Sequence, residues 1–282
     1  MHRIRKIKTR YGDFVFRDKP PEGLLVTPRG RKLRRRYARL LSTLRVTPEG
    51  RPAIHPEFDP HFVGKGVHGQ VFRIAPKNLS WAERLAKRWR NIPKPKTMVV
   101  KGYSSGLERL QVDGISQLVA ETELYNFLKK RRNKFFVPYL PKYFFASNRF
   151  LVRKFERFPR VSDLLFFFDM TSDPSLQSAY SSMGFLSENP LSAREMNRFV
   201  RVNDISRGEV ESMVAEVKQA LLREYPKAVL RGKKGFPVEF DLERHNRNIL
   251  VRGRDPKTRR LSIAVYDQGQ RSIPNVLDHI KK

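Results

Sequence analysis

The sequence has no cysteine and few acidic residues. Its 282 residues include 28 Asp and Glu against 58 Lys and Arg, which gives a formal net charge of +30. The absence of Cys excludes a disulfide scaffold, a thiolate nucleophile and any zinc or iron–sulfur site ligated by cysteine. The excess of positive charge predicts attraction to polyanions, namely nucleic acid, an anionic membrane surface or phosphorylated ligands, and charge alone does not choose among the three.

Long apolar runs are also absent. No stretch approaches the roughly 18 apolar residues that span a bilayer, and the N-terminus lacks the apolar core of a secretory signal. Hydrophobic residues still make up 39% of the chain, which is enough for a buried core. We therefore expect a folded cytoplasmic protein, whose basic N-terminal segment gives it a means of contact with the inner face of a membrane.

Residues 1–55 form a basic leader. Its one periodic element covers residues 31–46, where apolar side chains recur on one stripe of a helix: Leu33, Tyr37, Leu40, Leu41 and Leu44. Pro28 and Gly30 precede this expected helix and Pro48 follows it. Two roles stay open for it, packing its leucines on the main domain or docking its arginines on a polyanion.

The remainder of the chain predicts an α+β fold in two parts. Residues 56–156 contain short β-branched strands and one helix, with a basic insertion at residues 76–96. Residues 157–282 are mostly helical up to residue 225 and return to strands after residue 236.

A glycine-rich motif lies between two strand-like runs of the first part. Gly64, Gly66 and Gly69 are followed by Val71 in a G-x-G-x-x-G-x-V pattern. Such a loop needs glycine because the backbone folds tightly over phosphates, with its N–H groups facing the phosphate oxygens. The strand–loop–strand context favours a kinase-type loop over a dinucleotide fingerprint, which needs strand–loop–helix. An ordinary glycine-rich hairpin gives the same pattern, so the motif requires further support.

Two charged residues follow in the order that a kinase-type loop requires. Lys101 ends the strand-like run Val99-Val100-Lys101 and fits the lysine that contacts the α- and β-phosphates of ATP. Glu121 lies on the following helix and fits the ion-pair partner of that lysine, with Glu123 as the alternative.

Three later segments complete a resemblance to the protein-kinase-like superfamily, which covers about residues 58–270. Residues 150–165 look like the last strand of an N-lobe, a hinge and the first helix of a C-lobe, and residues 238–251 resemble a catalytic loop that runs into a strand. Asp267-Gln268-Gly269 resembles the D-F-G turn, whose Asp holds Mg²⁺. The resemblance implies a two-lobed fold with a β-rich N-lobe, one main N-lobe helix and a mostly helical C-lobe.

The segment that resembles a catalytic loop admits two registers. A kinase places its catalytic Asp five residues before the metal-binding Asn, and both Asp241 with Asn246 and Glu243 with Asn248 have this spacing. The first register resembles bacterial lipopolysaccharide-core sugar kinases, and the second resembles phosphoinositide kinases with Glu in place of Asp. The resemblance implies Asp241 as the base and Asn248 as a metal ligand, with Glu243 and Asn246 as alternatives. His245 would orient the base or contact the transferred phosphate.

The function that this resemblance implies is ATP- and Mg²⁺-dependent transfer of the γ-phosphate to a hydroxyl group. Thirteen residues (270–282) follow Gly269, too few for the activation segment and helices that form a peptide platform. We therefore expect a truncated C-lobe and a sugar, small-molecule or membrane-linked acceptor rather than a folded protein. Because Gln268 replaces the Phe of the D-F-G turn and the catalytic loop is irregular, a pseudokinase remains an alternative. The basic leader and the basic insertion at 76–96 leave a second alternative, a module that binds RNA or anionic membranes without turnover.

Overall fold

The structure, a computed structural model, describes residues 4–17, 23–34, 43–54, 58–66, 69–76, 98–104, 113–173, 191–225 and 248–265. The described strands are β1 (Ile4–Thr9), β2 (Gly12–Arg17), β3 (Gly23–Val26), β4 (Arg45–Val46), β5 (Pro52–Ala53), β6 (Phe58–Gly66), β7 (Gly69–Pro76), β8 (Met98–Tyr103), β9 (Phe136–Pro138), β10 (Tyr143–Ala146), β11 (Phe150–Lys154), β12 (Ile249–Arg254) and β13 (Leu261–Val265). The described helices are α1 (Pro28–Arg34), α4 (Gly114–Lys130), α5 (Val161–Ser172), α7 (Ala193–Asn203) and α8 (Arg207–Gln219), the last continued by the π-helical turn η3 (Ala220–Glu224).

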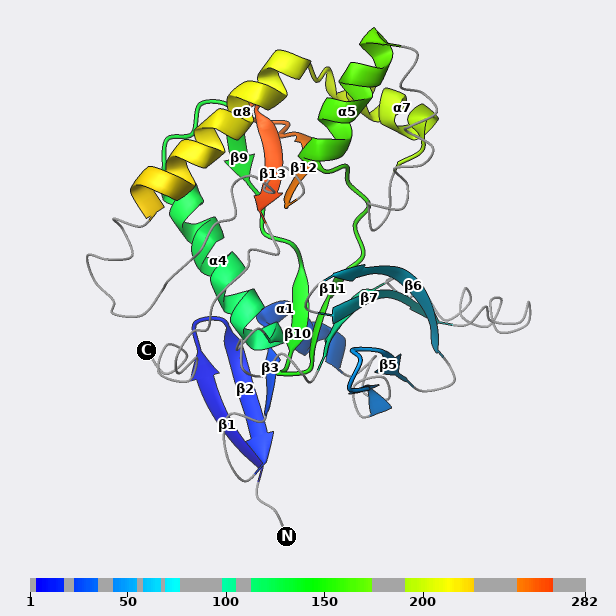
Figure 1. The fold of residues 1–282 in the computed structure, drawn as a ribbon. Coiled ribbons are helices and arrows are strands. Elements are labelled where there is room, and N and C mark those ends of the chain that lie inside the picture. Colours follow the sequence, from blue (N-terminus) through cyan, green and yellow to red (C-terminus); the bar gives the residue numbers. More distant parts are fainter. Residues whose placement is uncertain are drawn as a thin grey trace, which may run out of the picture.

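An antiparallel sheet of eight strands forms the lower part of the molecule in Figure 1, in the order β1-β2-β3-β10-β11-β8-β7-β6. The upper part contains α5, α7 and α8 around a small sheet in which β13 pairs antiparallel with β12 and parallel with β9. We call these the sheet part and the helical part. The expected α+β class is confirmed.

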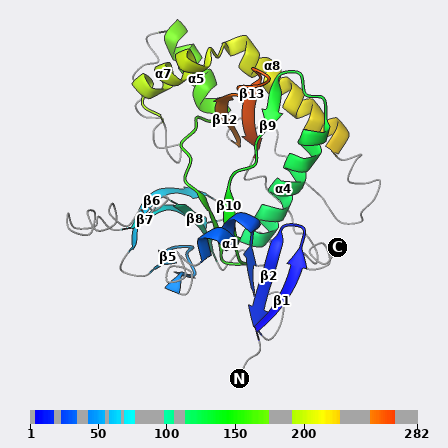
Figure 2. The same ribbon diagram turned by 180° about the vertical axis from the view of Figure 1, so that it is seen from behind.

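Helix α4 connects the two parts and covers one face of the large sheet (Figures 1 and 2). It begins after Asp113, whose carboxylate accepts a hydrogen bond from the backbone N–H of Ser116 at 2.7 Å and caps the helix. Burial raises the pKa of Asp113 above its usual value. The helix ends near Lys129 and Lys130, where positive charge is favourable at a helix C-terminus.

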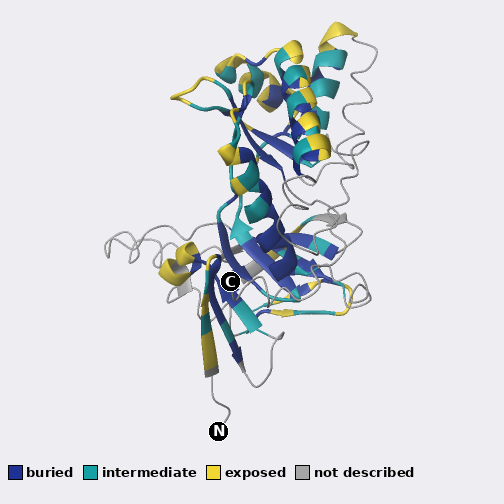
Figure 3. Ribbon diagram, turned by 90° about the vertical axis from the view of Figure 1, so that its left-hand side faces the viewer, coloured by how far each residue is buried: buried dark blue, intermediate teal, exposed yellow. Residues whose placement is uncertain are grey.

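The large sheet has an apolar core on each face. The face toward α4 buries residues of β2, β8, β11 and α4 itself, including Phe14, Tyr103, Leu118 and Leu151. The opposite face buries Val26, Val100, Phe145 and Val152 beneath α1 and the β4–β5 hairpin. Because both faces are covered at the centre of the sheet, β8, β10 and β11 are almost continuously apolar rather than alternating, and Figure 3 shows the centre of the sheet in the colour of buried residues.

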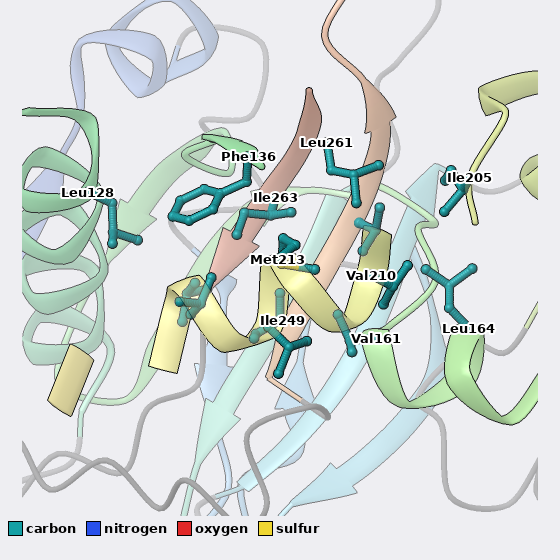
Figure 4. Close-up of a cluster of buried hydrophobic side chains, with 14 of the residues drawn as sticks. Leu128, Phe136, Val161, Leu164, Ile205, Val210, Met213, Ile249, Leu261 and Ile263 are labelled. Carbon is teal, nitrogen blue, oxygen red and sulfur yellow. The ribbon is translucent and has the colours of Figure 1, made fainter. Parts of the chain in front are cut away.

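The helical part has its own core, which Figure 4 shows in close-up. Val210 and Met213 of α8 pack against Ile249 of β12 and Ile263 of β13, and all four side chains are at most 1% exposed. Met196, which is fully buried, brings α7 to the same core. None of the described helices is long and apolar enough to cross a membrane.

The helix expected at residues 31–46 was predicted with the wrong first and last residues. The helix α1 starts at Pro28, because the hydroxyl of Thr27 accepts a hydrogen bond from the N–H of Gly30 at 3.0 Å and proline suits the first helical position. Arg45–Val46 form strand β4, and residues 35–42 lie outside the described residues. Gly30 is part of α1 because it packs against β10, where an added Cβ would lie 2.0 Å from the carbonyl oxygen of Phe144.

The expectation of a leader with one periodic element is wrong as well. Strands β1, β2 and β3 extend the large sheet beyond β10, so residues 4–17 and 23–26 belong to the fold. The short strands and the one helix expected in residues 56–156 are confirmed by β6 to β11 and α4. The helices expected up to residue 225 are confirmed by α5, α7 and α8, and the strands expected after residue 236 by β12 and β13. Most of the basic insertion at 76–96 lies outside the described residues.

Candidate functional site

The glycine motif occupies the end of the β6–β7 hairpin, where Gly66 pairs with Gly69. Val71 pairs with Gly64 on one side and with Lys101 of β8 on the other. Three of the residues predicted to bind nucleotide therefore lie at one level across three neighbouring strands, which in a sheet are about 4.8 Å apart. Figure 2 shows β7 and β8 side by side at the edge of the sheet part.

Gly69 has a structural requirement of its own. A Cβ added there would lie 1.9 Å from the carbonyl oxygen of Gly102, so no other residue fits between β7 and β8 without moving a strand. The next residue, Gln70, donates a hydrogen bond from its amide to the carbonyl oxygen of Glu49 at 3.1 Å. The turn after β4 thus holds the tip of the hairpin from the side opposite α4.

Lys101 and Glu121 are connected through Gln117 of α4. The Lys101 Nζ donates to Gln117 Oε1 at 3.2 Å, and Gln117 Nε2 donates to Glu121 Oε1 at 2.6 Å. The hydroxyl of Tyr103 also donates to Gln117 Oε1. Glu121 is 3% exposed and Tyr103 2%, so this is a buried polar chain under the sheet, with Lys101 at its half-buried end.

The two acids left open as partners of Lys101 have different surroundings. Glu123 accepts a hydrogen bond from the hydroxyl of Tyr11 at 2.8 Å and forms an ion pair with Arg10 at 3.2 Å, both from the β1–β2 hairpin. Burial, together with this hydrogen bond, raises the pKa of Tyr11. Glu121 faces β8, and the structure therefore brings Glu121 rather than Glu123 to the lysine strand.

Asn248 is the one candidate of the catalytic loop within the described residues. It directly precedes β12, whose Ile249 pairs with Val265 at the end of β13. Asp241, Glu243, His245 and Asn246, which precede Asn248, lie outside the described residues, as does Asp267, two residues along the chain from Val265. Within the described residues, no group of three or more His, Asp or Glu is placed to hold a metal ion.

The segment between β11 and α5 ties the helical part to the sheet part. The N–H of Val251 donates to the carbonyl oxygen of Pro159 at 2.9 Å, and Arg160 and Leu250 form an isolated antiparallel bridge. The hydroxyl of Tyr139 donates to the carboxylate of Glu156 at 2.8 Å, which joins the two chain segments that run between the parts. The position of β12, and with it Asn248, is therefore fixed relative to β11.

The residues missed at the sequence level are Gln117 and Tyr103. Gln117 precedes Glu121 by one helical turn, so the two share a face of α4. Tyr103 lies two residues after Lys101 on a strand, so both side chains point to the same side of the sheet. Either spacing could have indicated these neighbours once Lys101 and Glu121 were chosen.

Comparison with known proteins adds no further assignment, since no protein-family model and no curated protein matches this chain.

Proposed function

We propose that the protein is an ATP- and Mg²⁺-dependent phosphotransferase of the protein-kinase-like superfamily. The observation that carries the proposal is the ladder Gly64–Val71–Lys101 together with the connection from Lys101 through Gln117 to Glu121. In kinases a glycine loop joins the first two strands, the phosphate-binding lysine is on the third, and its acidic partner is on the helix that follows. Here β6, β7, β8 and α4 carry these groups in that order.

Each residue has a role in this proposal. The backbone of the Gly64–Gly69 hairpin covers the phosphates, and Lys101, oriented by Gln117 and Glu121, contacts the α- and β-phosphates. Asn248 and Asp267 would hold Mg²⁺, whose charge neutralises the phosphates during transfer. Asp241 orients the acceptor hydroxyl and takes its proton, with Glu243 as the alternative base, and His245 orients the base or contacts the transferred phosphate.

The same proposal assigns the sheet part as the N-lobe and the helical part as the C-lobe, with residues 155–160 as the hinge. This assignment is supported by the segment from β11 to α5, which links the two parts and contacts β12. The acceptor in this proposal is a hydroxyl of a sugar, small molecule or membrane-linked compound, an assignment that rests on the resemblance to short sugar kinases.

Thermal unfolding with and without Mg²⁺ and ATP tests the nucleotide site. A ligand at 100 times its Kd stabilises a protein by about 2.7 kcal/mol, which raises Tm by roughly 5 °C for a chain of this size. We expect such a shift for the parent protein and its loss in Lys101→Ala and Asp267→Ala. Lys257→Ala is the matched control, because Lys257 is an exposed residue of the β12–β13 turn.

Transfer of the γ-phosphate separates an enzyme from a module that binds nucleotide. Slow ATP hydrolysis or acceptor phosphorylation that Lys101→Ala and Asp241→Asn abolish supports the phosphotransferase. A nucleotide-dependent shift without any transfer supports a pseudokinase. If millimolar ATP with Mg²⁺ causes no shift in the parent protein, the proposal is wrong.

A further inference from the structure

Helix α7 carries a single line of arginines on its outer side. Arg194, Arg198 and Arg201 are all exposed and have the spacing i, i+4 and i+7, so they follow one another along the helix at rises of about 6 and 4.5 Å. The opposite side of the helix is the buried one, through Met196, with Phe199 packed against the same core. The three guanidinium groups therefore point away from the protein.

Hydrogen bonds at both ends of α7 hold the helix, and with it the three arginines, in place. Ser192 caps its N-terminus by accepting from the N–H of Glu195, and the Glu195 carboxylate accepts in return from the N–H of Ser192 at 2.8 Å. At the other end, the Asn203 side chain accepts from the N–H of Arg254, which anchors α7 to β12. Figures 1 and 2 show α7 on the side of the helical part that lies away from α4.

The acids around α7 are mostly engaged with other groups. Glu195 pairs with Arg157 at 2.8 Å, and Glu209 pairs with Arg254 at 2.6 Å. Asp204 is a further acid, which caps the C-terminal end of α7. Within the part of the chain that the structure describes, the three α7 arginines form no ion pair. A solvated helix surface commonly mixes both signs of charge, whereas this line carries one sign alone.

We propose that Arg194, Arg198 and Arg201, the arginine line, bind the phosphate backbone of single-stranded nucleic acid. Arginine presents a planar fork that matches phosphate oxygens, and release of counterions from the nucleic acid drives such binding. A bilayer surface is the weaker fit, because stable membrane attachment needs an inserted apolar group or acyl chain besides charge. Met196 and Phe199 of α7 are packed into the core and cannot insert, and the exposed Val202 is a single short apolar side chain near the end of the helix.

The test measures binding of a mixed-sequence, single-stranded RNA of about 20 nucleotides by fluorescence anisotropy at several salt concentrations. The variant is Arg194→Gln with Arg198→Gln and Arg201→Gln, since glutamine keeps the helix propensity. The matched control is Lys32→Gln with Lys130→Gln and Lys257→Gln, which removes the same charge from three exposed sites elsewhere. Far-UV circular dichroism and Tm check that both proteins fold as the parent does.

Each phosphate contact contributes about 0.7 to the slope of log K against log salt for single strands. We therefore expect the arginine variant to lower that slope by about 2 and to weaken binding about 100-fold at 0.1 M salt, with a smaller loss in the control. Equal losses in variant and control would overturn the proposal, because binding would then follow net charge alone. Parent protein that binds vesicles of anionic lipid but not the RNA would overturn it as well.

Discussion

Replacing Gln117 by leucine tests the buried polar chain between β8 and α4. Gln117 is 9% exposed and accepts from Lys101 and Tyr103 while donating to Glu121. Leucine has a similar length and good helix propensity, so the change removes these hydrogen bonds without breaking α4. What remains is a buried tyrosine hydroxyl and a buried carboxylate that have each lost a partner.

The loss of stability is estimated from the two buried hydrogen bonds. A neutral bond such as the one from Tyr103 contributes about 1 kcal/mol, and a bond to a charged group such as Glu121 contributes about 1.5 to 3 kcal/mol. The half-buried end at Lys101 adds little. Together these terms give about 3 kcal/mol, which for a chain of this size lowers Tm by roughly 5 °C.

The measurement is thermal unfolding followed by far-UV circular dichroism, with Gln219→Leu as the matched control. Gln219 is the last residue of α8 and is exposed, so the same substitution there should change stability by about 0.5 kcal/mol or less. If the protein is a phosphotransferase, the Gln117 variant should also lose the Tm shift with Mg²⁺ and ATP. Equal Tm values for the two variants would refute the reasoning, since Gln117 would then hold no buried partner.

Two further predictions concern the glycine hairpin and the link between the two parts. Gly69→Ala should lower Tm by several degrees, because the new Cβ would overlap Gly102, whereas Gly208→Ala, with nothing within 4 Å, should raise it slightly. If both alanines behave alike in thermal unfolding, the close approach of β7 and β8 is not what requires glycine. Burial and the hydrogen bond to Glu156 raise the pKa of Tyr139 to about 12 from 10.0, so the folded state keeps this proton longer than the unfolded state. The stability that Tyr139 contributes is complete below pH 10 and is lost as the pH rises to 12. In Tyr139→Phe the free energy of unfolding should therefore fall less steeply between pH 10 and 12 than in the parent protein. Equal pH dependence of the two proteins would contradict the raised pKa of Tyr139.

The elements that the sequence predicted well are those with strong local patterns. The β-branched run that became β8 and the helix that carries Glu121, α4, could be read directly, since each pattern is continuous along the chain. Strands β1 and β2 were missed because this region is rich in lysine and arginine, which makes the alternating pattern of its apolar residues harder to recognise. Phe14 and Phe16 are buried there, and their alternation is the signal that was overlooked.

The small sheet of the helical part depends on contacts that no local pattern contains. Strand β9 has three residues, and its parallel partner β13 lies far along the chain, at Leu261–Val265. The pairing of Leu261 with Phe136 is fixed by the common core, where both side chains are fully buried. Tertiary packing therefore decides the existence of this strand, and propensity does not.

In the candidate site, too, local motifs predicted single residues, whereas contacts between residues far apart in the sequence determine how these residues lie relative to one another. The motif predicted Gly64, Val71 and Lys101 one by one, and antiparallel pairing places them on one ladder. Asn248 is far from Lys101 in sequence, and its place follows from a chain of pairings: β12 to the segment after β11 through Arg160, and β11 to β8. A change in the segment after β11 should consequently alter the distance between Asn248 and Lys101 while leaving both residues intact. The geometry of the site is thus set by the link between the two parts, which no motif within either part contains.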